Sequence, residues 1–293
     1  MLSEERRQND CTVHLIKPYI ISSIMVHLNG NTKLNLNEDL IRHISLNCLR
    51  SFNKQFKTRF GNMIICCDSK RSWRKDVFPF YKFNRRKNRE TSSLDWTSIF
   101  EILNKIRDEI KENLPYRVLE VEGAEADDII GVLTSRFSPS ENILILSSDK
   151  DFIQLQKYRN VQQYSPILKR FLKTENPQMF IKEHIIRGDT GDGIPNFLSS
   201  DNTFAIGERQ KRINKNRMIE WINNDPEVFC VTDSMKHGYH RNKMLVDLDC
   251  IPRDLQARIV TMYDDIKPKN KTIFLNYLIK NKLKNLIEIA DEF

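Results

Sequence analysis

Several common features are missing from this chain of 293 residues. Its six cysteines form no CxxC pair, and none lies near a histidine at zinc-ligand spacing, so we expect reduced, mostly buried thiols in a cytosolic protein. No apolar run approaches the roughly 20 residues that span a bilayer, and the N-terminal residues lack the apolar core of a signal peptide. No internal repeat or low-complexity tract is evident. We therefore expect no membrane association and a protein that stays where it is made.

The composition is that of a globular protein with a basic balance. Hydrophobic residues make up 40% of the chain and charged residues 29%, which is enough apolar material for a real core. The length suits one large domain or a core with a smaller second unit. There are 47 lysines and arginines against 39 aspartates and glutamates. Such an excess favours a partner that carries phosphates.

Apolar runs that end in aspartate indicate the fold class. Residues 62–67 are followed by Asp68, and residues 142–148 by Asp149, in the manner of buried parallel strands. Residues 12–25 predict a strand that runs into a helix, and further helices and a strand are expected at 40–56, 94–113, 116–121 and 124–137. Alternating strands and helices predict an α/β fold with a mainly parallel, doubly wound sheet flanked by helices. From about Lys182 the pattern becomes helical, so we expect an α/β core at 1–181 and a smaller helical domain at 182–293.

Eight carboxylates fall in four short clusters at the ends of these elements. Taken alone, residues 125–128 read as ordinary acids at a helix start, 149–151 as a polar turn, and 189–193 as a helix stop. Together they suggest a site for divalent cations, because clustered acids repel one another unless cations bind there. Hard oxygen ligands suit two Mg²⁺ ions, for which Mn²⁺ can substitute. The predicted ligands are Asp68, Glu125, Asp127, Asp128, Asp149, Asp151, Asp189 and Asp192.

A basic and aromatic stretch begins directly after Asp68. Residues 70–89 contain nine basic side chains and one acid, interleaved with five aromatic residues. A solvated basic face is the plainer interpretation, but phosphate binding with base stacking uses this composition. We expect Lys82 and Arg85 to steer the scissile phosphate as catalytic residues. The other predicted nucleic-acid contacts of this stretch are Arg74, Lys75, Arg86, Lys87 and Arg89.

The order of the motifs resembles that of the 5′-nuclease (flap endonuclease) family, whose core is PIN-like. The resemblance rests on residues 67–68 (CD), 73–76 (WRKD), 81–85 (YKFNR), 125–128 (EADD), 148–151 (SDKD), 188–195 (GDTGDGIP) and 245–252 (LVDLDCIP). It covers nearly the whole chain and is strongest to phage members. It implies 5′-to-3′ exonuclease, flap endonuclease and ribonuclease H activity on RNA–DNA and DNA duplexes, which removes RNA primers and adjacent DNA from lagging-strand fragments.

The same resemblance implies roles for the residues and partners for the protein. Asp68, Glu125, Asp127 and Asp149 match a first metal site, while Asp151, Asp189 and Asp192 match a second, with Asp128 as an outer ligand. Residues 69–92 match an arch over the 5′ strand, and 188–211 a duplex-binding motif. Expected partners are a phage sliding clamp and single-strand-binding protein, and we expect a monomer in the cytoplasm of the infected bacterial host. Duplex contacts are predicted at Gly207, Arg209, Lys211 and Arg212.

One position departs from the family pattern. The family has an aspartate at the end of its first strand, where this chain has Lys17 followed by Pro18. A lysine in place of an aspartate changes a charge of −1 to +1 near the cation. At about 5 Å and an effective dielectric of about 20, the cost is roughly 3 kcal/mol for each product of unit charges. The alternative to an active nuclease is therefore an impaired or inactive one that binds branched DNA. We interpret all six histidines as structural or solvated: His14, His27, His43, His184, His237 and His240.

Overall fold

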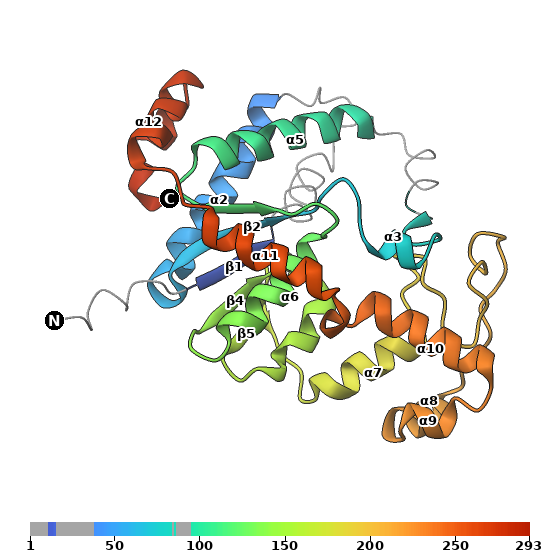
Figure 1. Ribbon diagram of the computed structural model, residues 1–293. Coiled ribbons are helices and arrows are strands. Elements are labelled where there is room, and N and C mark those ends of the chain that lie inside the picture. Colours follow the sequence, from blue (N-terminus) through green and yellow to red (C-terminus); the bar gives the residue numbers. More distant parts are fainter. Residues whose placement is uncertain (1–10, 16–37, 84, 86–94) are drawn as a thin grey trace.

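The computed structural model describes residues 11–15, 38–83, 85 and 95–293 (Figure 1). Its centre is a six-stranded sheet with the order β3-β2-β1-β4-β5-β6. All neighbouring pairs are parallel except β5 and β6. The sequence order of the strands reverses between β1 and β4, and ligands of doubly wound sheets bind beyond the strand ends at that point. The strands are β1 (Cys11–Leu15), β2 (Asn62–Cys67), β3 (Arg117–Glu120), β4 (Ile143–Leu146), β5 (Val161–Ser165) and β6 (Arg170–Leu172).

Helices cover both faces of the sheet, as predicted. The alternation of side chains along β2 sends Ile64 and Cys66 to one face and Met63, Ile65 and Cys67 to the other. The first face packs against α6 (Ala126–Phe137) and α11 (Arg253–Asp265), and the second against α2 (Glu38–Phe60) and α5 (Trp96–Asn113). Every residue of β4 is buried, which explains its unbroken apolar run. The predicted fold class is confirmed.

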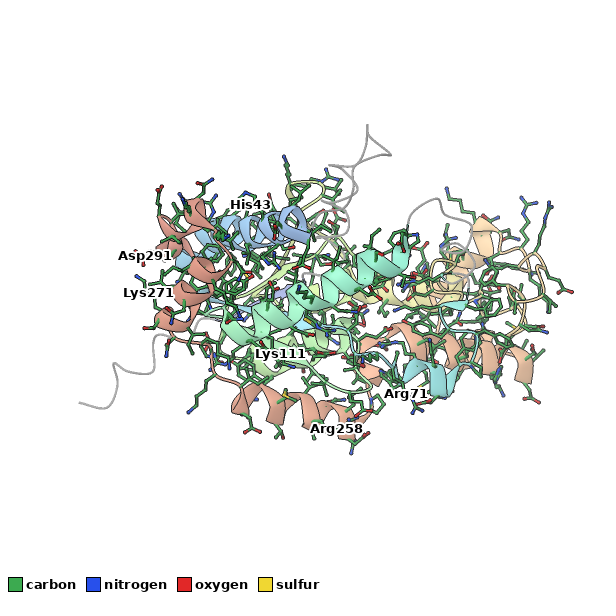
Figure 2. All side chains as sticks on the ribbon, turned by 90° about the horizontal axis from the view of Figure 1, so that it is seen from above. His43, Arg71, Lys111, Arg258, Lys271 and Asp291 are labelled. Atoms are coloured by element: carbon green, nitrogen blue, oxygen red, sulfur yellow. The ribbon has the colours of Figure 1, made fainter. Side chains whose placement is uncertain are left out.

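The second half of the chain packs in two separate regions. A separate aromatic core around Phe197 is formed with α8 (Lys215–Asn223) and α9 (Pro226–Phe229), and α7 (Pro177–Arg187) and α10 (Asp233–Val246) connect it to the sheet. Residues 253–293 return to the sheet. Here α12 (Lys271–Lys280), α13 (Lys284–Ile287) and η4 (Ala290–Glu292) pack on α2 and α5, at the opposite end of the molecule from α8 and α9 (Figure 1). Figure 2 shows the ion-paired Lys271 and Asp291 there.

The predicted boundary at 181/182 stays a prediction, because α7 crosses it and residues 253–293 pack with the first unit. A helical unit in the described chain is therefore centred on α7 to α10. The remaining short elements are α3 (Arg74–Val77), η2 (Lys150–Lys157) and η3 (Leu248–Cys250).

Candidate metal centre and nucleic-acid interface

The first group of acids lies at the carboxyl ends of two strands and at the start of the helix beside them. Asp68 follows β2 directly, and Asp149 follows β4 after two serines. Glu125 and Asp127 lie at the start of α6, and the backbone N–H of Ala126 donates a hydrogen bond to Asp68 at 2.9 Å. Because the carboxyl ends of parallel strands meet at one edge of a sheet, these side chains converge.

A turn after α7 brings the second group to the same edge. Gly188 ends the helix with φ 67°, and a Cβ there would lie 2.4 Å from the carbonyl oxygen of Ile194, so only glycine fits. Beyond it, Asp189 accepts hydrogen bonds from the N–H groups of Gly191 (2.8 Å) and Asp192 (3.2 Å). A small cavity between the two groups is lined by five of the predicted ligands: Glu125, Asp127, Asp151, Asp189 and Asp192.

The acids perturb one another's protonation. Burial, followed by the charges of Asp149 and Glu125, raises the pKa of Asp127 well above its ordinary value. Desolvation by the surrounding protein and the adjacent Asp151 raise the pKa of Asp149, although its own surface faces solvent. Neighbouring carboxyl groups resist ionising together because their negative charges repel one another, and a bound divalent cation removes that repulsion.

Four residues of the basic stretch contact these acids, and one of them is Arg74, whose guanidinium lies 3.4 Å from Glu125. Lys82 Nζ lies 2.5 Å from Glu125 Oε1 and 3.8 Å from Asp192 Oδ2, and Arg85 pairs with Asp192. The hydroxyl of Tyr81 lies 2.8 Å from Glu125 and 3.1 Å from Asp192. Burial opposes the ionisation of Glu125, but Lys82 and then Arg74 outweigh it and hold the pKa of Glu125 below its ordinary value.

The formal charges of the centre do not balance. Apart from the Arg74–Asp128 pair, whose charges cancel, seven carboxylates face three basic side chains, Lys82, Arg85 and Lys150, the last of which lies 3.1 Å from Asp189. Among the described residues this leaves an excess of four negative charges, which equals the charge of two divalent cations. The acids are Asp68, Glu125, Asp127, Asp149, Asp151, Asp189 and Asp192.

The structure argues against two of the predicted roles. Asp128 is fully buried and its oxygens lie 2.8 and 3.0 Å from the guanidinium of Arg74. It also accepts hydrogen bonds from Trp73 (3.2 Å) and from the backbone N–H of Glu125 (2.8 Å), so protein donors already occupy its Oδ2 while its Oδ1 faces the Arg74 guanidinium. Arg74 is itself only 3% exposed, so it does not face a nucleic acid. The sequence of the basic stretch does not show which of its arginines will be buried.

The other predicted nucleic-acid contacts lie at the surface where the structure describes them. Lys75, Gly207, Arg209, Lys211 and Arg212 are exposed. Lys17, Arg86, Lys87 and Arg89 lie outside the described residues. The segment that carries Gly207 to Arg212 is anchored through Asn196, whose side chain donates to the carbonyl of Lys211 at 2.7 Å, and through Ser199, which accepts from the N–H of Lys211 at 2.8 Å. A shallow cavity lined by Lys150, Asp189, Asn196 and Gln210 joins this segment to the acidic centre.

His184, which we predicted from the sequence to be structural or solvated, lies beside the second group of acids. Its Nε2 lies 3.2 Å from Asp151 Oδ1 and 3.8 Å from Asp189 Oδ2. The side chain is 6% exposed and stacks on Phe180, with 6.0 Å between ring centroids. Its place in the last turn of α7, shortly before Gly188, was visible in the sequence, but its proximity to Asp151 depends on the packing of α7 against η2.

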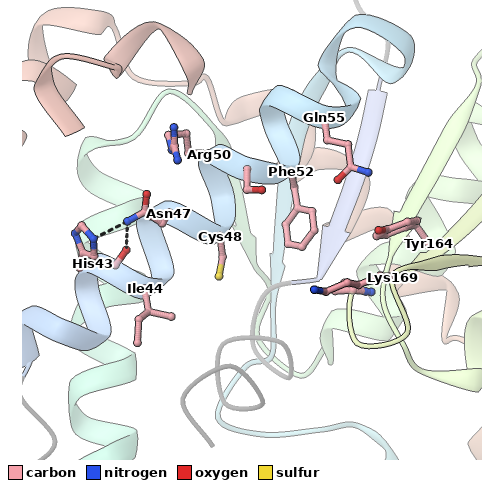
Figure 3. A pocket seen from close by; sticks show the side chains of 11 residues that line it. His43, Ile44, Asn47, Cys48, Arg50, Phe52, Gln55, Tyr164 and Lys169 are labelled. Carbon is pink, nitrogen blue, oxygen red and sulfur yellow. Dashed lines mark hydrogen bonds between the residues drawn. The ribbon is translucent and has the colours of Figure 1, made fainter. Parts of the chain in front are cut away.

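A second pocket lies between α2 and the β5–β6 turn (Figure 3). His43, Asn47, Phe52 and Gln55 line it from α2, and Lys169 lines it from the turn. Asn47 donates to the backbone carbonyl of His43 at 3.1 Å. Its described lining residues include no carboxylate, so it adds nothing to the metal centre.

Comparison with known proteins decides the family. A family model described as "5'-3' exonuclease, N-terminal resolvase-like domain" matches residues 34–186, and one described as "T4 RNase H, C terminal" matches residues 175–293. Ribonuclease H of Enterobacteria phage T4 is 35% identical over 304 aligned residues, which cover 100% of this chain and 98% of the relative. The chain belongs to the 5′–3′ exonuclease and flap endonuclease family. The resemblance predicted from the motifs is thereby confirmed, including its strength toward phage members.

Other proteins resemble this chain less closely. A 5'-3' exonuclease of Buchnera aphidicola subsp. Acyrthosiphon pisum is 32% identical over 151 residues, which cover 48% of this chain and 50% of the relative. The crystal structure of the T5 D15 protein co-crystallised with metal ions has a TM-score of 0.61 at 17% identity, covering 87% of this chain and 97% of that chain. A structure of the T5 5'-exonuclease with bound zinc ions gives a TM-score of 0.60 at 17% identity, with 86% and 98% covered. Both structures share the fold of this chain. In the described part of the chain, no helix is long and apolar enough to cross a membrane.

Proposed function

We propose that this protein is a metal-dependent 5′-to-3′ exonuclease and flap endonuclease with ribonuclease H activity, which removes RNA primers and adjacent DNA during phage replication. The observation that carries the proposal is the convergence of seven carboxylates and three basic side chains at one edge of the sheet. Membership of the 5′-nuclease family and the full-length similarity to a phage ribonuclease H support it.

The residues at the centre fit two divalent cations. In this proposal Asp68, Glu125, Asp127 and Asp149 hold one ion, and Asp151, Asp189 and Asp192 hold the other. The excess of four negative charges and the raised pKa values of Asp127 and Asp149 are the observations that support the fit. When bound, two such ions polarise a scissile phosphate and activate the attacking water. Oxygen ligands suit Mg²⁺, and Mn²⁺ can substitute for it.

The basic residues then have a role that depends on the substrate. Lys82 and Arg85 neutralise Glu125 and Asp192 in the structure. Once cations neutralise these acids, the two side chains become free to bind a phosphate of the scissile strand, Arg85 through its planar fork and Lys82 as a point charge. Both lie beside the centre, so they would orient the phosphate that is cut.

The exposed basic residues indicate the substrate class. Lys75, Arg209, Lys211 and Arg212 present positive charge at the surface, which suits a duplex backbone. We infer RNA–DNA and DNA duplexes with 5′ ends or flaps as substrates. A phage sliding clamp and single-strand-binding protein are the proposed partners, and the proposed place of action is the cytoplasm of the infected bacterium, with the protein as a monomer.

Lys17 supports a competing function. The strand that precedes it, β1, lies at the centre of the sheet next to β4, the strand that leads to Asp149. A lysine in place of the family's aspartate there would oppose cation binding. In that case the protein binds branched DNA without cutting it.

Cleavage of a 5′-flap substrate and of an RNA–DNA duplex in Mg²⁺ distinguishes the two functions. We would compare the natural chain with Lys17→Asp and with Asp149→Asn, and measure flap binding in EDTA to show that each variant is folded. Cleavage by the natural chain that is lost in Asp149→Asn establishes the nuclease. Cleavage only by Lys17→Asp establishes an inactivated nuclease, and no cleavage by either contradicts the metal centre.

A further inference from the structure

A buried nitrogen atom faces the second group of acids. His184 Nε2 lies 3.2 Å from Asp151 Oδ1 and 3.8 Å from Asp189 Oδ2, and ligand atoms of all three residues lie within 4.8 Å of one another. Two ligands at about 2.1 Å from an ion are about 3.0 Å apart when they subtend a right angle and about 4.2 Å apart when they are opposite. Both histidine distances therefore fit ligands of a single ion.

The two facing atoms have no other partner. Neither His184 Nε2 nor Asp151 Oδ1 makes a hydrogen bond, although both atoms are buried. Buried polar atoms are nearly always paired, so an unpaired nitrogen and an unpaired oxygen that face each other indicate a ligand between or beside them. Phe180 stacks on the ring of His184 and restricts its orientation, which keeps Nε2 directed at the acids.

The remaining contacts of the cluster leave room for a cation. Lys150 Nζ lies 3.1 Å from Asp189 Oδ2, but its side chain is 56% exposed and can move into solvent. Asp189 Oδ1 is held by the N–H groups of Gly191 and Asp192, so its other oxygen stays directed at His184. The cluster is thus held by backbone contacts on one side and by a mobile lysine on the other.

We propose that His184 is a ligand of the second metal ion, which makes this position a mixed nitrogen and oxygen site that selects Mn²⁺ over Mg²⁺. The inference rests on the metal centre of the proposed function and adds a ligand that the acid clusters did not predict. Imidazole nitrogen suits transition metals, whereas Mg²⁺ prefers an all-oxygen shell. The other position, which has only carboxylate ligands, has no such preference.

Electron spin-echo spectroscopy of the full chain with bound Mn²⁺ tests this directly. A directly bound imidazole produces ¹⁴N modulation of the Mn²⁺ echo, and the signal changes to that of ¹⁵N when the protein is grown with ¹⁵N-labelled histidine. This measurement needs no variant. We expect ¹⁴N modulation in the natural chain and its replacement on labelling. Two bound Mn²⁺ ions without nitrogen modulation would overturn the role of His184 while the metal centre stands.

A matched pair of variants measures the selectivity. In His184→Gln the ¹⁴N modulation should disappear, and calorimetric titration should show at least a tenfold weaker Mn²⁺ affinity at one site and a Mg²⁺ affinity within about twofold of that of the natural chain. His237 is the control, because it also faces an aspartate, Asp201 at 3.1 Å, but on the surface. His237→Gln should change neither quantity. Equal losses of Mn²⁺ and Mg²⁺ affinity in His184→Gln would overturn the selectivity, and absence of Mn²⁺ binding to the natural chain would overturn both this inference and the metal centre.

Discussion

Replacing Arg74 with alanine tests whether the buried Arg74–Asp128 pair stabilises the fold or serves nucleic-acid binding. Arg74 is 3% exposed and Asp128 is fully buried. The guanidinium also donates from Nε to the carbonyl of Leu245 at 2.8 Å and lies over the ring of Trp73 at 4.8 Å. The arginine therefore links the start of α6, the basic stretch and the end of α10.

The expected loss is large because the change leaves a buried charge without its partner. Removing one member of a buried ion pair typically costs about 3 to 5 kcal/mol of unfolding free energy. Arg71 provides the matched control, since it pairs with Asp76 in the same stretch but lies at the surface (Figure 2). Exposed pairs contribute little, so Arg71→Ala should leave the unfolding free energy unchanged within error.

Urea unfolding followed by circular dichroism measures both variants, with duplex affinity measured in parallel. In an Asp128→Asn background, Arg74→Ala should cost clearly less, because no buried carboxylate is left unpaired. The reasoning is refuted if Arg74→Ala is as stable as Arg71→Ala and instead loses affinity for duplex DNA. That result would restore the role that the basic stretch predicts for Arg74.

Three further predictions follow from single positions. Asp127→Asn should raise the unfolding free energy of the metal-free protein at pH 7 but not near pH 3. Burial and Asp149 raise the pKa of Asp127 in the folded protein, so this side chain opposes folding only above the pKa that it has in the unfolded chain. Urea titrations in EDTA at both pH values measure the difference. Gly238→Ala places a Cβ 2.0 Å from the carbonyl oxygen of Phe197 and should cost about 1 to 3 kcal/mol or more in urea unfolding; Gly207→Ala, at φ 73° with open space around it, should cost only about 1 kcal/mol, and the reverse order would contradict the packing. Lys211→Ala should lower the slope of log affinity against log salt by about 0.9 on duplex DNA, and an unchanged slope would remove it from the interface.

Local patterns predicted the sheet and the helices next to it well. The apolar runs before Asp68 and Asp149 are β2 and β4, and the helix expected at 94–113 is α5 at Trp96–Asn113. The helical pattern expected from about Lys182 is interrupted between α12 and α13, where Lys282 adopts φ 54°. No glycine or proline marks that break, and the local indication is weaker, an asparagine at position 281 that ends α12.

Features that depend on long-range packing were not predictable in this way. Arg74 and Asp128 each belong to a cluster of like-charged residues, and only the fold pairs them. His184 is likewise an ordinary helix residue until α7 packs against η2 and brings it to Asp151. Hydrophobic periodicity and composition identify acids that follow the end of a strand. They do not identify a residue that a helix from elsewhere in the chain brings next to those acids.

The position of the basic stretch follows from the charge of the acids beside it. Burial and neighbouring acids raise the pKa values of Asp127 and Asp149, and Lys82 and Arg85 are positive charges of the basic stretch that pair with Glu125 and Asp192 in the same centre. In the proposed function, divalent cations would bind the same oxygens and replace these contacts. The two side chains would then be released at the place where a phosphate must be held. Under the proposed function, the same residues would serve as counter-ions in the metal-free protein and as phosphate ligands in the metal-bound one, which would account for an acidic site and a basic stretch in adjacent positions.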